Sequence, residues 1–156
     1  MSTPVTPDRA LLERWLNASA VQNYLCEHCD NLHISEIRSQ EGVLDSRLIP
    51  ESFGLLFTTE LEIRPMALLA LSADLGRLNM EYPVLKLFLD VVDDATPQLV
   101  AAAIFPGNAG ITESQFNHFV AMTMQAMLQL AEECLRLDYL LSEDGSTRQR
   151  PRSVVH

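Results

Sequence analysis

The stretch "CEHCDNLH", residues 26–33, holds the side chains of this sequence most able to do chemistry. It contains two of the three cysteines and two of the four histidines. Thiolate and imidazole are good zinc ligands, and Cys-x-x-Cys spacing lets two sulfurs reach one ion. The candidate metal ligands are therefore Cys26, Cys29 and His33, with His28 as a further donor on paper. Three interpretations are open: a metal site, a redox pair, or an ordinary hairpin.

The metal interpretation suffers from an incomplete set of ligands. A structural zinc site usually draws its second pair of ligands from a distant segment. Here Cys134 falls in the apolar register of the last predicted helix, and His118 and His156 belong to no paired motif. In a strand-turn-strand, His28 would lie inside the turn, where it cannot easily share an ion with both sulfurs and His33. The sequence therefore assigns no metal site and no cofactor.

The redox interpretation lacks the expected helix. A thioredoxin-like Cys-x-x-Cys opens a helix, whose positive end lowers the thiol pKa. Here the pair precedes "DNLHI", which is typical of a turn and then a strand, with Asp30 and Asn31 supplying the turn chemistry. The plainest prediction is a tight hairpin in which the two cysteines act as small apolar residues.

Other signatures of chemistry are missing from the sequence. The acidic group Asp90, Asp93 and Asp94 lacks the spacing and the distal Glu of a calcium loop. Walker, Gly-x-Gly-x-x-Gly, Gly-x-Ser-x-Gly and His-Glu-x-x-His motifs do not occur. We therefore predict a protein that is not an enzyme, with no catalytic and no cofactor-binding residues.

Composition narrows the location and the partners. The 156 residues carry a net charge of −10, which repels nucleic-acid phosphates and anionic membranes. No apolar stretch is long enough to cross a bilayer, and the first residues do not resemble a secretory signal. Three cysteines, an odd number, fit a reducing compartment. We expect a cytoplasmic protein that binds neither nucleic acid nor membrane.

The elements that must position these side chains follow from hydrophobic periodicity. Thr6 is a candidate N-cap for the first helix, and Thr112 with Gln115 forms a capping box for the last, whose outer face should carry Glu132 and Glu133. In chain order the segments give α-β-β-β-α-β-β-α. Whether the second strand region is divided in two near residues 38–42 stays open. Helical spacing marks residues 7–18, 64–79 and 112–140, and strand-like runs mark residues 21–26, 32–35, 42–49, 53–63 and a hairpin at 82–105.

This order predicts an α+β fold, a sandwich in which helices pack on an antiparallel sheet. Residues 1–141 form one domain in this interpretation. Residues 142–156 are polar and lack periodicity, which predicts a flexible C-terminal tail.

Five dispersed segments resemble the YbjN family: "CEHCDNLHI", "EGVLDSRL", "EIRPMALLALSADLGRLN", "LKLFLDVVDDATPQLV" and "GITESQFNHFV". The resemblance covers residues 10–140. It implies a fold similar to the class I type III secretion chaperones, which are small, acidic and dimeric and bind partner polypeptides. It also implies a regulatory role that affects virulence, exopolysaccharide, motility, biofilm and stress responses. It supplies no catalytic residue and no metal.

Three functions are therefore in competition. The leading hypothesis is a non-enzymatic cytoplasmic regulator that acts through protein–protein contacts as a homodimer. The second is a type III secretion chaperone that binds an effector segment. The third is a zinc or redox sensor centred on Cys26, Cys29 and His33.

Overall fold

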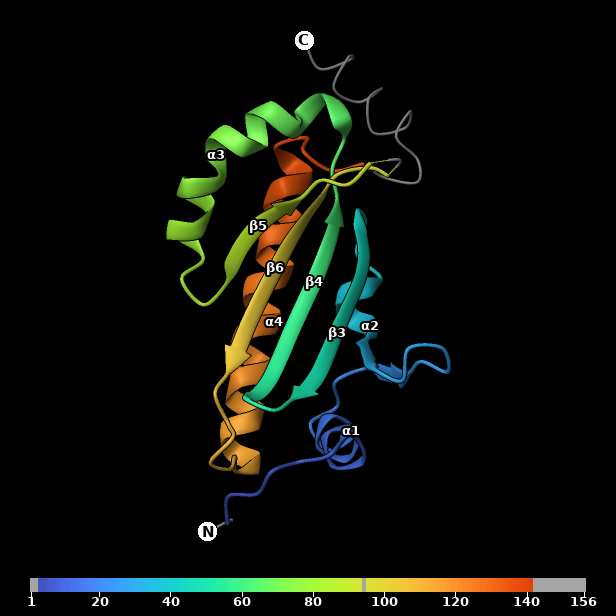
Figure 1. The fold of residues 1–156 in the computed structure, drawn as a ribbon, viewed down its shortest axis with the longest axis vertical. Helices are drawn as coiled ribbons and strands as arrows, with labels where there is room; N and C mark the ends of the chain where they lie inside the picture. Colours follow the sequence, from blue (N-terminus) through green and yellow to red (C-terminus); the bar gives the residue numbers. More distant parts are fainter. Residues whose placement is uncertain (1–2, 94, 142–156) are drawn as a thin grey trace.

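The computed structural model describes residues 3–93 and 95–141. Its centre is a six-stranded antiparallel sheet of order β1-β2-β3-β4-β6-β5, crossed on one face by a long helix (Figure 1). The elements are α1 (Arg9–Ala18), β1 (Asn23–Leu25), β2 (Leu32–Ile34), α2 (Ser35–Arg38), β3 (Val43–Glu51), β4 (Gly54–Glu62), the 3-10 helix η1 (Pro65–Ala67), α3 (Leu68–Glu81), β5 (Lys86–Asp90), β6 (Gln98–Phe105) and α4 (Glu113–Arg136).

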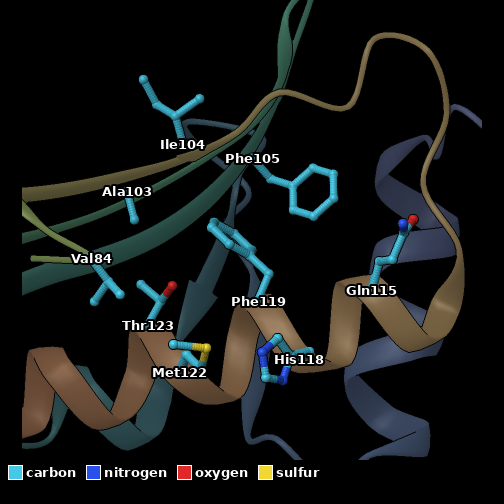
Figure 2. Close-up of a pocket in the computed structure, with 9 residues that line it drawn as sticks. All are labelled: Val84, Ala103, Ile104, Phe105, Gln115, His118, Phe119, Met122 and Thr123. Atoms are coloured by element: carbon cyan, nitrogen blue, oxygen red, sulfur yellow. The ribbon is translucent and has the colours of Figure 1, made fainter.

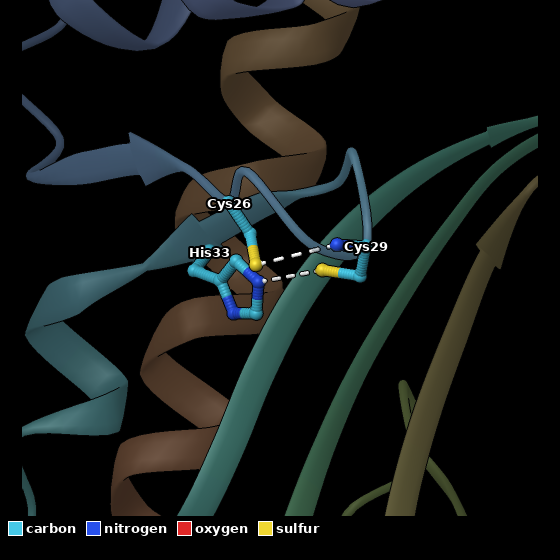
Figure 3. A group of neighbouring side chains, drawn as sticks. All are labelled: Cys26, Cys29 and His33. Carbon is cyan, nitrogen blue, oxygen red and sulfur yellow. Dashed lines mark hydrogen bonds between the residues drawn. The ribbon is translucent and has the colours of Figure 1, made fainter.

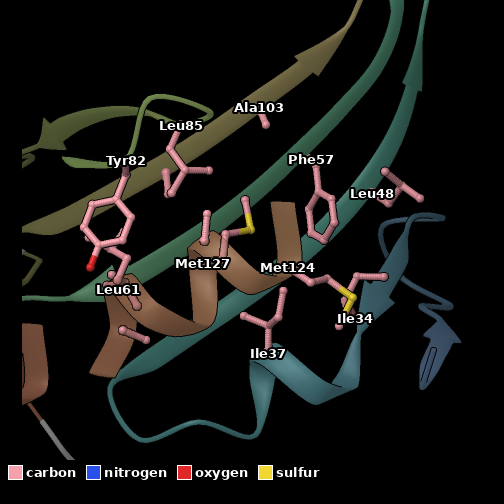
Figure 4. Close-up of a cluster of buried hydrophobic side chains, with 14 of the residues drawn as sticks. Ile34, Ile37, Leu48, Phe57, Leu61, Tyr82, Leu85, Ala103, Met124 and Met127 are labelled. Atoms are coloured by element: carbon pink, nitrogen blue, oxygen red, sulfur yellow. The ribbon is translucent and has the colours of Figure 1, made fainter. Parts of the chain in front are cut away.

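The core lies between the sheet and α4. Alternate residues of β4 are buried, among them Phe57 and Leu61, and they face Met124 and Met127 of α4 (Figure 4). Full burial of one large apolar side chain contributes about 1.5–3 kcal/mol, so each such residue of this layer adds to the driving force for folding. The predicted α+β class, an antiparallel sheet with helices packed on it, is confirmed.

The predicted order of elements differs from the structure in one region. The predicted order has three strands between the first two helices, although four strand-like runs are marked there, and the structure has four strands and the one-turn helix α2. Strands β1 and β2 have three residues each, and α2 has four. Segments this short hold less than two full periods of either pattern, so periodicity cannot count them.

The ends of two helices also differ from the sequence prediction. Asp8, and not Thr6, caps α1, because its side chain accepts a hydrogen bond from the Leu11 amide. Helix α4 ends at Arg136, short of residue 140. Asp138 then adopts φ 67°, which turns the chain so that Leu140 forms a bridge with Ile63.

The predicted capping box at the start of α4 is confirmed. The Thr112 hydroxyl accepts from the Gln115 amide at 3.1 Å, and the Gln115 side chain accepts from the Thr112 amide at 2.9 Å. Ile111 before the cap and Phe116 after it are both buried, as a hydrophobic staple requires. The start of α4 is thereby fixed against the end of β6.

The two strands of the β5–β6 hairpin differ in whether their backbone has a neighbour: β5 is bonded by a side chain of α3, whereas the end of β6 extends beyond β5. On the outer side of β5, Asn79 of α3 pairs with Leu87: its amide donates to the Leu87 carbonyl at 3.1 Å and its carbonyl accepts from the Leu87 amide at 2.9 Å. Strand β5 pairs with β6 only up to Lys86 opposite Ala102, whereas β6 continues to Phe105. The last three residues of β6 therefore have a free edge.

No helix among the described residues combines the length and the apolar content that crossing a membrane requires. The predicted tail, residues 142–156, lies outside the described residues.

Candidate functional site

The Cys-x-x-Cys stretch forms the loop of the β1–β2 hairpin, as predicted. Tyr24 pairs with His33 across the two strands. The Cys26 amide donates to the Asn31 carbonyl at 3.0 Å, and the Asp30 amide donates to the Cys26 carbonyl at 3.1 Å. Asp30 has φ 63°, in the left-handed region, which lets the chain return after so few residues. The loop therefore folds back over its own first cysteine.

This folding brings together the three candidate ligands. The sulfurs of Cys26 and Cys29 and a ring nitrogen of His33 all lie within 4.8 Å of one another (Figure 3). The Cys29 sulfur is 3.1 Å from His33 Nε2, and the Cys29 amide donates to the Cys26 sulfur at 3.4 Å. Both cysteines are free thiols.

Asp45 of β3 holds the imidazole of His33 from the other side. Its Oδ1 lies 2.7 Å from His33 Nδ1, and the His33 residue is only 5% exposed. A carboxylate at that distance accepts a hydrogen bond from Nδ1, so Nε2 is the ring nitrogen that faces the sulfurs. Tyr24 stacks on the ring with centroids 4.9 Å apart and planes at 7°. We call Cys26, Cys29, His33 and Asp45 the hairpin cluster.

Sequence reasoning missed Asp45. It lies twelve residues beyond His33 on another strand, and its side chain also meets the guanidinium groups of Arg38 at 3.5 Å and Arg47 at 3.8 Å. The available signal was strand parity. A pairing of β2 with β3 sets His33 against Arg47, and Asp45 is two residues along the same face.

The electrostatics of the loop favour a thiolate at Cys26. The pKa of Cys26 is lowered to about 6, chiefly because the Cys29 amide donates to its sulfur, with the Cys29 side chain and the His28 backbone adding to the effect. Since the thiolate is the nucleophile and the metal ligand, Cys26 is chemically active near neutral pH. The expectation that both cysteines act as buried apolar residues is wrong, because Cys29 is exposed and Cys26 half-buried.

The other sequence candidates lie elsewhere. His28 is exposed and stands outside the group of converging ligands, as expected for a residue inside the turn. Cys134 is fully buried in α4, and burial raises the pKa of its thiol to about 12. His118 lies on α4 beside a separate groove. His156 is outside the described residues.

That groove runs between the free edge of β6 and the first half of α4 (Figure 2). It has a volume of about 370 Å³. Ile104 is 55% exposed and Met122 43% exposed at its rim. Its lining is mainly apolar: Val84, Ala103, Ile104, Phe105, Gln115, His118, Phe119, Met122 and Thr123.

The backbone amide and carbonyl of Ile104 point away from β4, toward this open edge. The backbone amide and carbonyl of Leu87 both bond to Asn79, so they point away from β6. The residues on either side of Leu87 therefore point their backbone groups toward β6, where they lie opposite even-numbered residues. Ile104 shares that parity but lies beyond the last β5 partner. Within residues 3–93 and 95–141, its amide and carbonyl have no hydrogen-bond partner.

A second polar group joins α3 to α4. Arg77 contacts Asp74 at 2.7 Å, Glu81 at 3.0 Å and Glu133 at 3.0 Å. The hydroxyl of Tyr82 donates to Glu133 at 2.6 Å, and that of Tyr139 to Asp74 at 2.9 Å. The α3–α4 polar cluster consists of Asp74, Arg77, Glu81, Tyr82, Glu133 and Tyr139.

This cluster corrects one expectation from the sequence. Glu133 is not on the outer face of α4, because its side chain is only 12% exposed and is bonded on two sides. Helix α3 covers it, which periodicity within α4 alone cannot predict. Glu132, one residue earlier, is exposed as expected.

Comparisons with known proteins match this fold. A family model described as "YbjN: Putative bacterial sensory transduction regulator" matches residues 8–136. The chain belongs to the YbjN family. It is 31% identical over 144 residues to "Uncharacterized protein YbjN" of Escherichia coli strain K12, covering 92% of this chain and 91% of that protein, and equally similar to the Shigella flexneri protein of that name.

A solved structure agrees with the same assignment. It is described as "Crystal structure of YbjN, a putative transcription regulator from E. coli", with a TM-score of 0.85 at 30% identity. The match covers 90% of this chain and 99% of that one. The family is therefore one described as regulatory and uncharacterized, and the resemblance predicted from the five segments is confirmed.

Proposed function

We propose that this chain is a non-enzymatic cytoplasmic regulator that binds an extended segment of a partner protein along the free edge of β6. The observation that carries the proposal is the unpaired backbone of Ile104 beside an apolar groove. A partner strand can complete the hydrogen bonds of an exposed edge while its alternate side chains enter adjacent pockets. Membership of a family described as regulatory supports a binding role.

The chemistry of the groove favours an apolar segment. Phe119 and Phe105 form an edge-to-face pair at its floor, with ring centroids 5.6 Å apart. Met122 at the rim is a flexible side chain that adapts to different partners. The net charge of −10 favours partners with basic flanking residues.

Partner capture from cells, followed by mass spectrometry, tests the proposal with variants of the groove. Ile104→Pro removes the outward amide of Ile104 without touching the pairs with β4, and proline is tolerated at such an edge. Met122→Glu places a charge at the apolar rim. We expect both variants to lose the partners that the wild type recovers.

The matched control is Met80→Glu, an 83% exposed methionine on α3 outside the groove, which should keep those partners. The proposal fails if the wild type recovers no partner above background, or if both groove variants retain the same partners as the wild type. If the recovered segment is the N-terminal part of a secreted effector, the chain acts as a secretion chaperone.

We further propose that the regulator is a homodimer and that its targets are the virulence, exopolysaccharide, motility, biofilm and stress responses that the family resemblance implies. Light scattering of the purified chain tests the first point. A mass of twice 17.5 kDa supports the dimer, and a mass of 17.5 kDa contradicts it. Deletion of the gene, followed by assays of those responses, tests the second.

A further inference from the structure

The hairpin cluster has the donor chemistry of a transition-metal site. It offers two sulfurs and one imidazole nitrogen, all within 4.8 Å of one another. Zinc binds sulfur at about 2.3 Å and histidine nitrogen at about 2.0–2.1 Å, so a small adjustment of the loop would bring all three ligand atoms to one ion. Sulfur donors disfavour magnesium and calcium, which take oxygen ligands.

The imidazole is already oriented for metal binding. Asp45 Oδ1 accepts a hydrogen bond from His33 Nδ1 at 2.7 Å, which directs Nε2 toward the Cys29 sulfur at 3.1 Å. Histidines that bind metals generally donate their other ring nitrogen to a carboxylate in this way, and that partner raises the basicity of the ligand. The stacked Tyr24 ring fixes the plane of the imidazole.

The backbone of the loop also suits a bound ion. The Cys29 amide donates to the Cys26 sulfur, a contact that favours a sulfur carrying negative charge. The loop is closed on itself by hydrogen bonds between residues 26, 30 and 31, so the two sulfurs are held on the same side as His33. Cys29 is exposed, which gives an ion a path from solvent.

We propose that Cys26, Cys29 and His33 bind one zinc ion, with Asp45 orienting His33 and the fourth coordination position open to an exogenous ligand. Closed structural sites supply four protein ligands, whereas three protein ligands leave a position for water or for a small thiol. The exposure of Cys29 leaves this site accessible from solvent. The proposal stands independently of the β6 groove.

Titration of the reduced, metal-free full chain with zinc chloride tests the site, with binding measured against a chromophoric zinc chelator. We expect one zinc per chain and an increase in the unfolding temperature on binding. Cobalt in place of zinc should give the visible absorption of a tetrahedral, thiolate-bound ion. Magnesium chloride should have no effect on either measurement.

Variants assign the ligands. Cys29→Ser changes an exposed side chain, so it should leave the fold intact and abolish stoichiometric binding. His28→Ala, in the same loop but outside the converging group, is the matched control and should bind zinc like the wild type. Asp45→Asn should weaken zinc binding by about 10–100-fold and alter the cobalt spectrum, with Asp45→Glu restoring part of the affinity.

The proposal is overturned if the reduced, folded chain binds no stoichiometric zinc, whether or not Cys26 and Cys29 can be oxidised to a disulfide. It is also overturned if Cys29→Ser binds zinc as tightly as the wild type. Because no partner protein is present in these measurements, loss of partner capture and loss of zinc binding are separate results.

Discussion

The hairpin cluster and the α3–α4 polar cluster lie toward opposite edges of the same sheet, and they use polar side chains in opposite ways. In the α3–α4 polar cluster, three carboxylates surround Arg77, and two tyrosine hydroxyls donate to two of those carboxylates. In the hairpin cluster, one carboxylate orients a histidine whose other ring nitrogen faces two cysteine sulfurs. A polar network in which every group has a partner makes the fold rigid. A cluster whose sulfur and nitrogen atoms can still coordinate an ion can take a ligand.

The largest expected contrast between the two regions is in thiol reactivity. Cys26 has a pKa lowered to about 6, and Cys134, next to Glu133, has one raised to about 12. At neutral pH the first is mostly thiolate and the second almost wholly thiol. Even allowing for the weaker nucleophilicity of a low-pKa thiolate, Cys26 should react at least about 100-fold faster.

Timed alkylation with iodoacetamide in metal-free buffer, followed by peptide mass spectrometry, measures the two rates. Zinc should slow the reaction of Cys26 and leave that of Cys134 unchanged. Similar rates at the two cysteines would remove the proposed difference between the clusters.

Breaking the α3–α4 polar cluster should cost stability. Glu133→Ala removes the acceptor of the buried Tyr82 hydroxyl and one partner of Arg77. An unsatisfied buried polar group costs about 1–3 kcal/mol, so the free energy of unfolding in urea should fall by about that amount. The neighbouring Glu132→Ala, at an exposed position, should change it by less than about 0.5 kcal/mol. Equal effects of the two substitutions would show that the cluster does not stabilise the fold.

The same cluster should respond to acid through Asp74. Hydrogen bonds from Arg77, and from Tyr139, lower the pKa of Asp74 below its ordinary value of 3.8. A lowered folded-state pKa gives stability that is present above 3.8 and is lost as the pH falls below it. The stability difference between the wild type and Asp74→Asn should therefore be constant from about pH 7 to about pH 5 and shrink toward about pH 3, in urea unfolding at each pH. A difference that grows on acidification would contradict this assignment.

The smallest effect is expected at the link between the hairpin loop and α1. Arg9 contacts the Asp30 carboxylate and carbonyl, both at 2.8 Å, but the side chains are 38% and 73% exposed. Exposed pairs of this kind contribute about 0.2–1 kcal/mol, so Arg9→Ala should lower the unfolding free energy by no more than that. Zinc affinity should be unchanged, and a large loss of affinity would mean that α1 helps to shape the site.

The sequence predicts the regular helices and strands of the fold and misses the contacts between distant segments. Alternation along β4 and the capping box at Thr112 are local patterns, and each is found in the structure. Cys26, Cys29 and His33 were identified as candidates because they are close in sequence. Asp45 and the burial of Glu133 depend on which strands and helices become neighbours, and a single sequence does not encode this in its periodicity.

The pairing of Asn79 with Leu87 limits how this protein can assemble. Strand addition propagates into a fibre when every subunit offers two open edges, since each newcomer then leaves an edge for the next. Here the Asn79 side chain occupies the outward backbone groups of Leu87 on β5, and the strand at the far edge, β1, is three residues long. If a polypeptide adds to β6 as proposed, the capped Leu87 and the short β1 leave little open edge from which a second addition could continue. The Asn79 side chain thus closes the outer edge of β5 at Leu87 to an added strand.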